Sequence, residues 1–188
     1  RSDERAWAPQ DVSVDEILNR ITTSDPRVAM ILRLELTFGL RVTEALRFVP
    51  AVDIVPGLHA EGAELHLHRG TKGGRPRKVP IEGANARTLL AEILQAVNQG
   101  SMTPSNSTIP AYRRKYYRVL ASHGVTRAAL GITSHGLRHQ YAQNVAAAAR
   151  ADGVDMQASR LQVAQRLGHG RASVTTTYMS SMDTKTHS

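Results

Sequence analysis

The sequence predicts a mainly helical α+β domain with one small antiparallel β-sheet. Apolar residues recur at helical spacing through most of the 188-residue chain, and 41% of its residues are hydrophobic, which is enough for a buried core. Two short segments, 65–68 and 79–81, alternate as strands do instead. The chain has no cysteine and no apolar run of about 18 residues, so we expect no disulfide, no thiolate metal site and no membrane span.

Two helices at the start of the chain are predicted by their capping residues. Ser13 and Glu16 form a capping-box pattern, and the helix that they open is expected to end near Thr22. Asp25 and Pro26 then have the pattern of an N-cap followed by a first-turn proline, which lacks the N–H that a first turn leaves unpaired. The helix that follows is strongly apolar, so we expect it to be buried.

A corner between two helices is predicted at residues 39–44, Gly-Leu-Arg-Val-Thr-Glu. Gly39 can adopt the left-handed conformation that ends many helices. Thr43 is expected to cap the next helix, with Glu44 in its first turn, where the helix dipole favours an acidic residue. Arg41 would then be held on a rigid support between the two helices.

The remaining predicted elements are a hairpin and further helices. The two strands are joined through residues 70–74, a glycine-rich turn that carries Lys72. Ser, Thr, Asn and Pro are frequent between 100 and 108 and predict a loop. Helices are expected at 84–98, 111–123, 136–149, 158–167 and 171–180.

Positive charge is concentrated towards the end of the chain. Residues 1–109 hold 13 Lys and Arg against 13 Asp and Glu, whereas residues 110–188 hold 11 against 3 and carry the whole formal net charge of +8. Such a basic face is typical of nucleic-acid binding, although a solvated surface that keeps a protein soluble has the same composition. The candidate DNA contacts are Arg69, Arg75, Arg77, Lys78, Arg113, Arg114, Lys115, Arg118 and Arg171.

Two patterns have a simpler structural interpretation. Tyr112 and Tyr116 are four residues apart, so they share a helix face and can pack in the core while the neighbouring cations face solvent. His66 and His68 lie on one face of a strand. Two histidines alone are too few ligands for a zinc site, so we expect no metal there.

Four residues near the end of the chain suit phosphate chemistry. His135 and Arg138 are three apart and share a helix face, and His169 and Tyr178 are nine apart. Arginine binds two phosphate oxygens at once and keeps its charge, while histidine can donate a hydrogen bond or move a proton near neutral pH. A tyrosine near these cations is favoured as its phenolate, which can attack phosphorus and keep the bond energy in an aryl phosphate ester.

Two upstream residues complete a set that can cleave a phosphodiester without a metal. Arg41 is the second arginine, although by itself it could merely bind helix-end carbonyls. Lys72, on its turn, is the candidate general acid for the leaving 5′ oxygen. His139 is expected to pack behind the site or to hydrogen-bond a residue that touches the phosphate.

These residues resemble the tyrosine recombinase (integrase) family. Its pattern is an arginine in a Gly-Leu-Arg-x-x-Glu corner, a lysine on a hairpin, His-x-x-Arg, a histidine or tryptophan after Leu-Gly, and a tyrosine further on. The resemblance extends from about Val12 to Tyr178. It implies that Glu44 supports Arg41, and that a mostly helical catalytic domain cuts DNA through a 3′-phosphotyrosine without metal or cofactor. The matching catalytic residues are Arg41, Lys72, His135, Arg138, His169 and Tyr178.

The resemblance also implies partners and a setting. The partner is double-stranded DNA, with strand exchange in a homo-tetramer assembled on two DNA sites and a monomer as the state without DNA. The source would be a bacterial mobile element or prophage, and the protein would act in the cytoplasm, at the nucleoid. We expect residues 1–188 to form a single catalytic domain with residues 1–11 flexible, residues 181–188 as a short tail and the family's N-terminal DNA-clamping domain missing. An apparent insertion around 148–159 departs from the family pattern.

Three other functions fit parts of the pattern. A type IB topoisomerase shares the chemistry but relaxes supercoils without pairing two sites. A catalytically silent DNA-binding module would keep the basic face but would have no need of Tyr178. A metal-dependent nuclease is the third alternative, and cleavage that is indifferent to EDTA would exclude it.

Overall fold

The computed structural model describes residues 14–125 and 134–167 of the chain. This part is mostly helical with a three-stranded antiparallel sheet, as the sequence predicts. None of the described helices combines the length and apolar character needed to span a bilayer. The elements in chain order are α1 (Val14–Ser24), α2 (Pro26–Phe38), α3 (Val42–Arg47), α4 (Pro50–Asp53), β1 (Ile54–Val55), β2 (Glu64–Leu67), the 3₁₀ turn η2 (Lys72–Gly74), β3 (Arg77–Pro80), α5 (Ala84–Val97), α6 (Ile109–Ser122), α8 (Ser134–Ala151) and α9 (Met156–Leu167).

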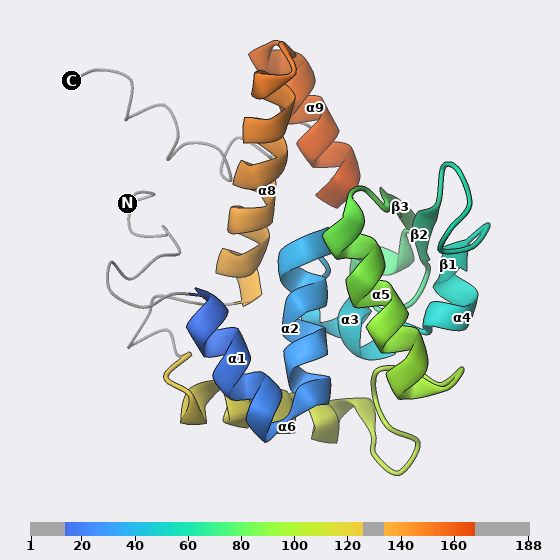
Figure 1. Cartoon of the computed structure of the whole chain (residues 1–188), viewed down its shortest axis with the longest axis vertical. Helices are drawn as coiled ribbons and strands as arrows, with labels where there is room; N and C mark the ends of the chain where they lie inside the picture. The colour runs from blue at the N-terminus through green and yellow to red at the C-terminus, as the bar shows by residue number, and fades with distance from the viewer. Residues whose placement is uncertain (1–13, 126–133, 168–188) are drawn as a thin grey trace.

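Helix α2 runs through the middle of the domain, with α1 and α6 at one end and α8 at the other (Figure 1). Its predicted ends are confirmed. The Asp25 side chain accepts a hydrogen bond from the Val28 N–H at 3.1 Å, and Gly39 ends the helix in the left-handed conformation at φ 60°. Most of the side chains between these caps are buried, which explains why an all-round apolar helix is stable here.

The sheet has the strand order β1-β2-β3, with both pairs antiparallel. The predicted hairpin is confirmed as β2 and β3, and Leu65 lies between Ile54 on one side and Val79 on the other. Strand β1 was not predicted, because a two-residue strand that directly follows a helical turn is too short to show alternation.

Helix α3 begins at Val42, so the prediction that Thr43 caps it is wrong. Arg41 occupies the N-cap position, and Glu44 is the acidic residue three positions later whose carboxylate accepts from the Arg41 N–H at 2.7 Å. The Thr43 hydroxyl donates instead to the Gly70 carbonyl at 2.9 Å. A carboxylate thus fills the capping role, and the threonine ties α3 to the start of the hairpin turn.

Helices α8 and α9 form a pair whose buried side chains make a second, smaller core. Helix α8 also packs on α2 through Tyr141, because a Cβ added at Gly39 would lie only 2.4 Å from the Tyr141 ring. Helix α8 begins two residues before the predicted start. The predicted helix at 171–180, and the segments expected to be a flexible start and a short tail, lie outside the described residues.

Candidate active site

The Arg41 side chain forms an ion pair with the buried carboxylate of Glu44. Its Nη1 donates to Glu44 Oε1 at 2.8 Å, while the other carboxylate oxygen accepts from the Arg41 backbone N–H. Glu44 is completely buried, but 22% of the Arg41 side chain is exposed. Since a guanidinium has five N–H donors, Arg41 is held firmly on one side and keeps donors for an anion on the other.

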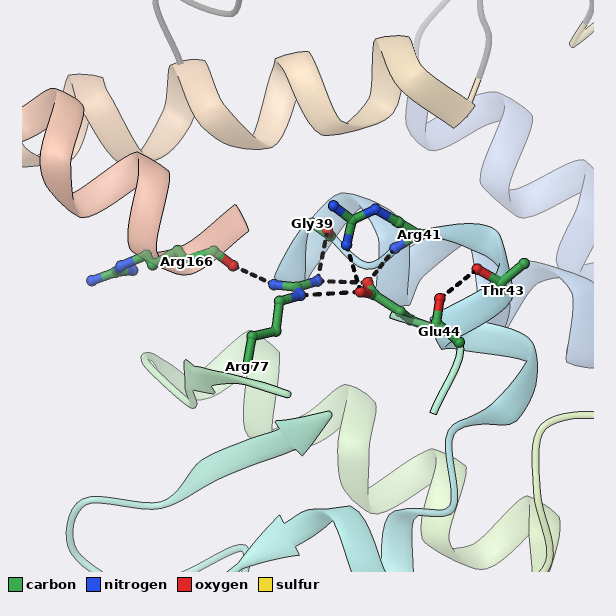
Figure 2. Close-up of polar contacts among 7 residues, drawn as sticks. Gly39, Arg41, Thr43, Glu44, Arg77 and Arg166 are labelled. Atoms are coloured by element: carbon green, nitrogen blue, oxygen red, sulfur yellow. Dashed lines mark hydrogen bonds and ion pairs between the residues drawn. The ribbon is translucent and has the colours of Figure 1, made fainter. Parts of the chain in front are cut away.

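Arg77 enters the same site from β3 and is buried, with a side-chain exposure of 4%. Its Nη2 donates to Glu44 Oε2 at 2.7 Å and to the Gly39 carbonyl at 3.1 Å, and its Nε donates to Glu44 Oε1 at 3.2 Å. Its Nη1 donates to the carbonyl of Arg166, near the end of α9. Figure 2 shows the Arg77 guanidinium between that carbonyl and the corner that carries Arg41.

The prediction that Arg77 contacts DNA does not fit this buried position. The alternation of β3 could have predicted that Arg77 is buried, because Arg77 and Val79 are two residues apart and so face the same side of the sheet. That side is the core side, whereas Lys78 points outward with 63% of its side chain exposed and pairs with Glu64. Five cations close together in the sequence are typical of one basic patch. In the folded strand, however, alternate side chains point to opposite faces, so Arg77 is buried and Lys78 is exposed.

The Glu44 carboxyl stays ionised although it is buried. Burial raises the pKa of the Glu44 carboxyl, but the hydrogen bonds and charges of Arg77 and Arg41 outweigh this effect and hold that pKa below its ordinary value. At neutral pH the site is thus built around a buried negative charge.

The low pKa of Glu44 predicts a loss of stability in acid. A carboxyl with a lower pKa in the folded protein stabilises it above the unfolded pKa of about 4.3, and this contribution disappears as the pH falls through the folded value. We expect the difference in unfolding free energy between the wild type and Glu44→Gln to be constant near neutral pH and to shrink below about pH 4. Urea unfolding at a series of pH values measures it, and the other carboxyls cancel because both proteins contain them. A difference that stays constant down to low pH would contradict the prediction.

The Lys72 turn is attached to the same corner. Gly70, two residues before Lys72, accepts the hydrogen bond from Thr43, two residues after Arg41. A Cβ at Gly70 would lie 2.4 Å from the Thr43 carbonyl oxygen, so the two backbones are in direct contact. Lys72 itself is exposed in the 3₁₀ turn, which suits a side chain that has to reach a bound substrate.

Three further predicted site residues lie on helix α8, which packs near this corner. His135, Arg138 and His139 lie in its first two turns; their side chains are outside the described part of the structure. Tyr141, three residues after Arg138, packs against Gly39. The backbone of α8 therefore approaches the corner that holds Arg41.

His169, Arg171 and Tyr178 lie outside the described residues. The described chain ends at Leu167. Arg166, directly before it, is the residue whose carbonyl binds Arg77. The point from which the chain continues to His169 is thus hydrogen-bonded to the site.

The cations of α6 and of the hairpin differ in whether they are exposed or bound to a carboxylate. Arg113, Arg114 and Arg118 are exposed on α6, and Arg75 is exposed on the hairpin. Lys115 is held by Asp25, with Nζ 2.6 Å from Oδ2. The remaining hairpin candidate for a DNA contact, Arg69, donates from Nη2 to both oxygens of Asp53, at 2.6 and 2.8 Å.

Tyr112 and Tyr116 are core residues, with exposures of 4% and 0%, which agrees with the packing interpretation of their spacing. The Tyr116 hydroxyl donates to Glu35 Oε1 at 2.6 Å. Burial raises the pKa of Tyr112 to about 12, and burial together with the charge of Glu35 raises the pKa of Tyr116 well above its ordinary value. Tyr141 is also buried and has a raised pKa. These three phenols resist ionisation, so they are poor nucleophiles.

Two other features are separate from the corner. His66 Nε2 lies 3.1 Å from Glu64 Oε2, but the side chains that the structure describes contain no group of three potential metal ligands. A cavity of about 670 Å³ lies between α2, α8 and α9, and neither Arg41 nor Lys72 lines it. Its lining includes Phe38, Glu82, Tyr141, Val145, Ala149 and Arg166.

The integrase family model matches residues 4–144. The match includes the corner at Arg41, the hairpin and the start of α8. The chain belongs to the integrase family. The match stops before His169 and Tyr178, whose roles stay predictions from the sequence.

Solved structures show the same fold as this integrase chain. One is the XerH site-specific recombinase bound to a palindromic difH substrate in a post-cleavage complex, with a TM-score of 0.55 and 19% identity over 93% of this chain and 53% of that one. Another is XerH bound to difH in a pre-cleavage complex, with a TM-score of 0.57 and 19% identity over 91% and 50%. The chain thus spans about half the length of these recombinases. A search of curated protein sequences finds no match.

Proposed function

We propose that this integrase-family chain is the catalytic domain of a site-specific DNA recombinase that cuts and rejoins DNA through a 3′-phosphotyrosine. The observation that carries the proposal is Arg41, an arginine fixed by a buried carboxylate with 22% of its side chain exposed, beside the helix that carries His135 and Arg138. Such an arrangement binds a phosphate without having to reorganise, which is the condition for effective electrostatic stabilisation of a transition state.

The proposed reaction uses only residues of the chain. Arg41 and Arg138 neutralise the non-bridging oxygens, and His135 and His169 donate hydrogen bonds to them in the transition state. The Tyr178 phenolate oxygen forms a bond to phosphorus, and the bond from phosphorus to the 5′ oxygen breaks. Lys72 gives its proton to that oxygen, which leaves as a 5′-hydroxyl. The same steps in reverse rejoin the strand.

Double-stranded DNA is the proposed substrate. The exposed cations of α6 and the hairpin can contact its phosphates, and the structural neighbours named above are recombinases bound to DNA substrates. We propose that the active form is a homo-tetramer on two DNA sites. A bacterial mobile element or prophage is the proposed source, and the cytoplasm, at the nucleoid, is the proposed place of action.

The covalent intermediate gives a direct test. The protein would first select its binding sequence from a random duplex library, and a nicked version of that duplex would then be incubated with it in EDTA and run on an SDS gel. We expect a covalent protein–DNA adduct with the wild type and none with Tyr178→Phe, because removal of the hydroxyl leaves DNA binding but no nucleophile. Peptide mapping of the adduct should place the phosphate on Tyr178.

Each alternative predicts a different result. Binding without an adduct identifies a DNA-binding module, and cleavage that EDTA abolishes identifies a metal-dependent nuclease. An adduct together with relaxation of supercoiled DNA, but no joining of two sites, identifies a topoisomerase.

A further inference from the structure

We infer that Arg77 is a positioning residue, which acts through Glu44 to hold Arg41 in place and which attaches the end of α9 to the same corner. The inference starts from its contacts. One guanidinium joins three segments that are far apart in the sequence: the corner at Gly39 and Glu44, its own strand β3, and Arg166 in α9. Figure 2 shows these contacts meeting at the Arg77 guanidinium.

Arg41 and Arg77 each donate hydrogen bonds to both oxygens of the Glu44 carboxylate. Oε1 lies 2.8 Å from Nη1 of Arg41 and 3.2 Å from Nε of Arg77, while Oε2 accepts from the Arg41 N–H and from Nη2 of Arg77, both at 2.7 Å. With both oxygens bound from two sides, the carboxylate has one orientation. Arg41, which depends on that carboxylate for its own position, is then fixed as well.

The charges of the three residues also matter. A pair made of Arg41 and Glu44 alone is neutral, so its attraction for a phosphate would be weak. With Arg77, the buried group consists of two positive charges and one negative charge. The buried Arg77 guanidinium cannot contact the substrate, but its positive charge neutralises the negative charge of Glu44. The positive charge of Arg41 is then available to attract an anion.

Lysine cannot replace Arg77 in this role. The guanidinium is planar, with donors that point to Glu44, Gly39 and Arg166 at once. A lysine ammonium is a compact group on a flexible stem, which keeps the charge but not this fork. Arg77→Lys therefore separates the positioning role of Arg77 from its charge.

The first measurement does not depend on any reaction. Nitrogen-15 relaxation of the Arg41 Nε–H, assigned by its absence in Arg41→Lys, reports how ordered that side chain is. We expect an order parameter near the rigid value of about 0.85 in the wild type and below about 0.6 in Arg77→Lys. The matched control is Arg33→Lys, which weakens another arginine–glutamate pair, with Glu92, away from the site; the Arg41 signal should not change.

The second measurement rests on the proposed function. With saturating DNA, adduct formation by Arg77→Lys should be slower than the wild type by about 10-fold to 100-fold, because small misplacements of a catalytic group have effects of this size. DNA affinity should stay unchanged. A merely structural role would instead lower the folded fraction, so that binding and cleavage would fall together.

The outcomes separate this inference from the proposed function. An Arg41 side chain that stays rigid in folded Arg77→Lys overturns the inference, whatever happens to DNA, and so does an adduct rate equal to that of the wild type. If the wild type forms no adduct but Arg41 loses order in the variant, the proposed function fails and the positioning role stands. Should Arg77→Lys not fold, Arg77→Gln, which keeps a hydrogen-bonding side chain and leaves Glu44 paired with Arg41, is interpreted in the same way.

Discussion

Replacing Arg41 with alanine is expected to slow strand cleavage by about 10³-fold, since the loss of one preorganised donor to a developing negative charge costs about 10² to 10³ and here a full charge is lost as well. The variant leaves Glu44 paired with Arg77, so the fold should survive because the buried carboxylate keeps a cationic partner. Single-turnover adduct formation at saturating DNA measures the effect.

Two further variants sharpen this prediction. Arg41→Lys keeps the charge but loses the fork that binds two phosphate oxygens, so its rate should lie between those of the wild type and Arg41→Ala. Arg33→Ala removes an arginine of α2 that pairs with Glu92 and does not contact the corner, so this variant should cleave normally. A near-normal rate for Arg41→Ala would remove Arg41 from the proposed site.

The second large effect is expected for Gly70→Ala. Gly70 has a φ of 74°, and the new Cβ would lie 2.4 Å from the Thr43 carbonyl oxygen and 2.7 Å from its carbonyl carbon. The left-handed conformation costs a residue with a side chain about 1 to 2 kcal/mol, and forcing a methyl group into a packed contact costs about 1 to 3 kcal/mol more. Because both atoms are backbone, relief requires the turn that carries Lys72 to move away from α3.

Gly62→Ala is the matched control for Gly70→Ala. Gly62 has a similar φ of 67°, but a Cβ there meets nothing within 4 Å, so only the conformational cost of about 1 to 2 kcal/mol applies. We expect urea unfolding to show a larger loss of stability for Gly70→Ala than for Gly62→Ala, and adduct formation to be slowed only by Gly70→Ala. Equal losses in the two variants would mean that the turn moves freely and that its contact with α3 does not position Lys72.

Much of the fold could be predicted because local chemistry determines it. Asp25 and Gly39 mark the ends of α2 through their own capping preferences, and Tyr112 and Tyr116 face the core because they are one helical turn apart on α6. The start of α3 could not be predicted from the preference of threonine for caps. Arg41 holds the N-cap position because Glu44 binds its N–H, while Thr43 is drawn to Gly70, a partner 27 residues away in the sequence.

The family pattern, the mainly helical class and the corner that holds Arg41 follow from the sequence alone, since they depend on residue types at short, regular spacings. The position of Arg77 does not, because it depends on tertiary contacts. Its neighbours in the sequence are cations, which made it look like part of a DNA-binding patch. Its neighbours in space are Glu44, Gly39 and Arg166. Strand alternation turns Arg77 inward, where α3 supplies the carboxylate and the end of α2 and α9 supply the two carbonyls. A buried charge needs partners from distant segments, and their meeting cannot be read from local spacing.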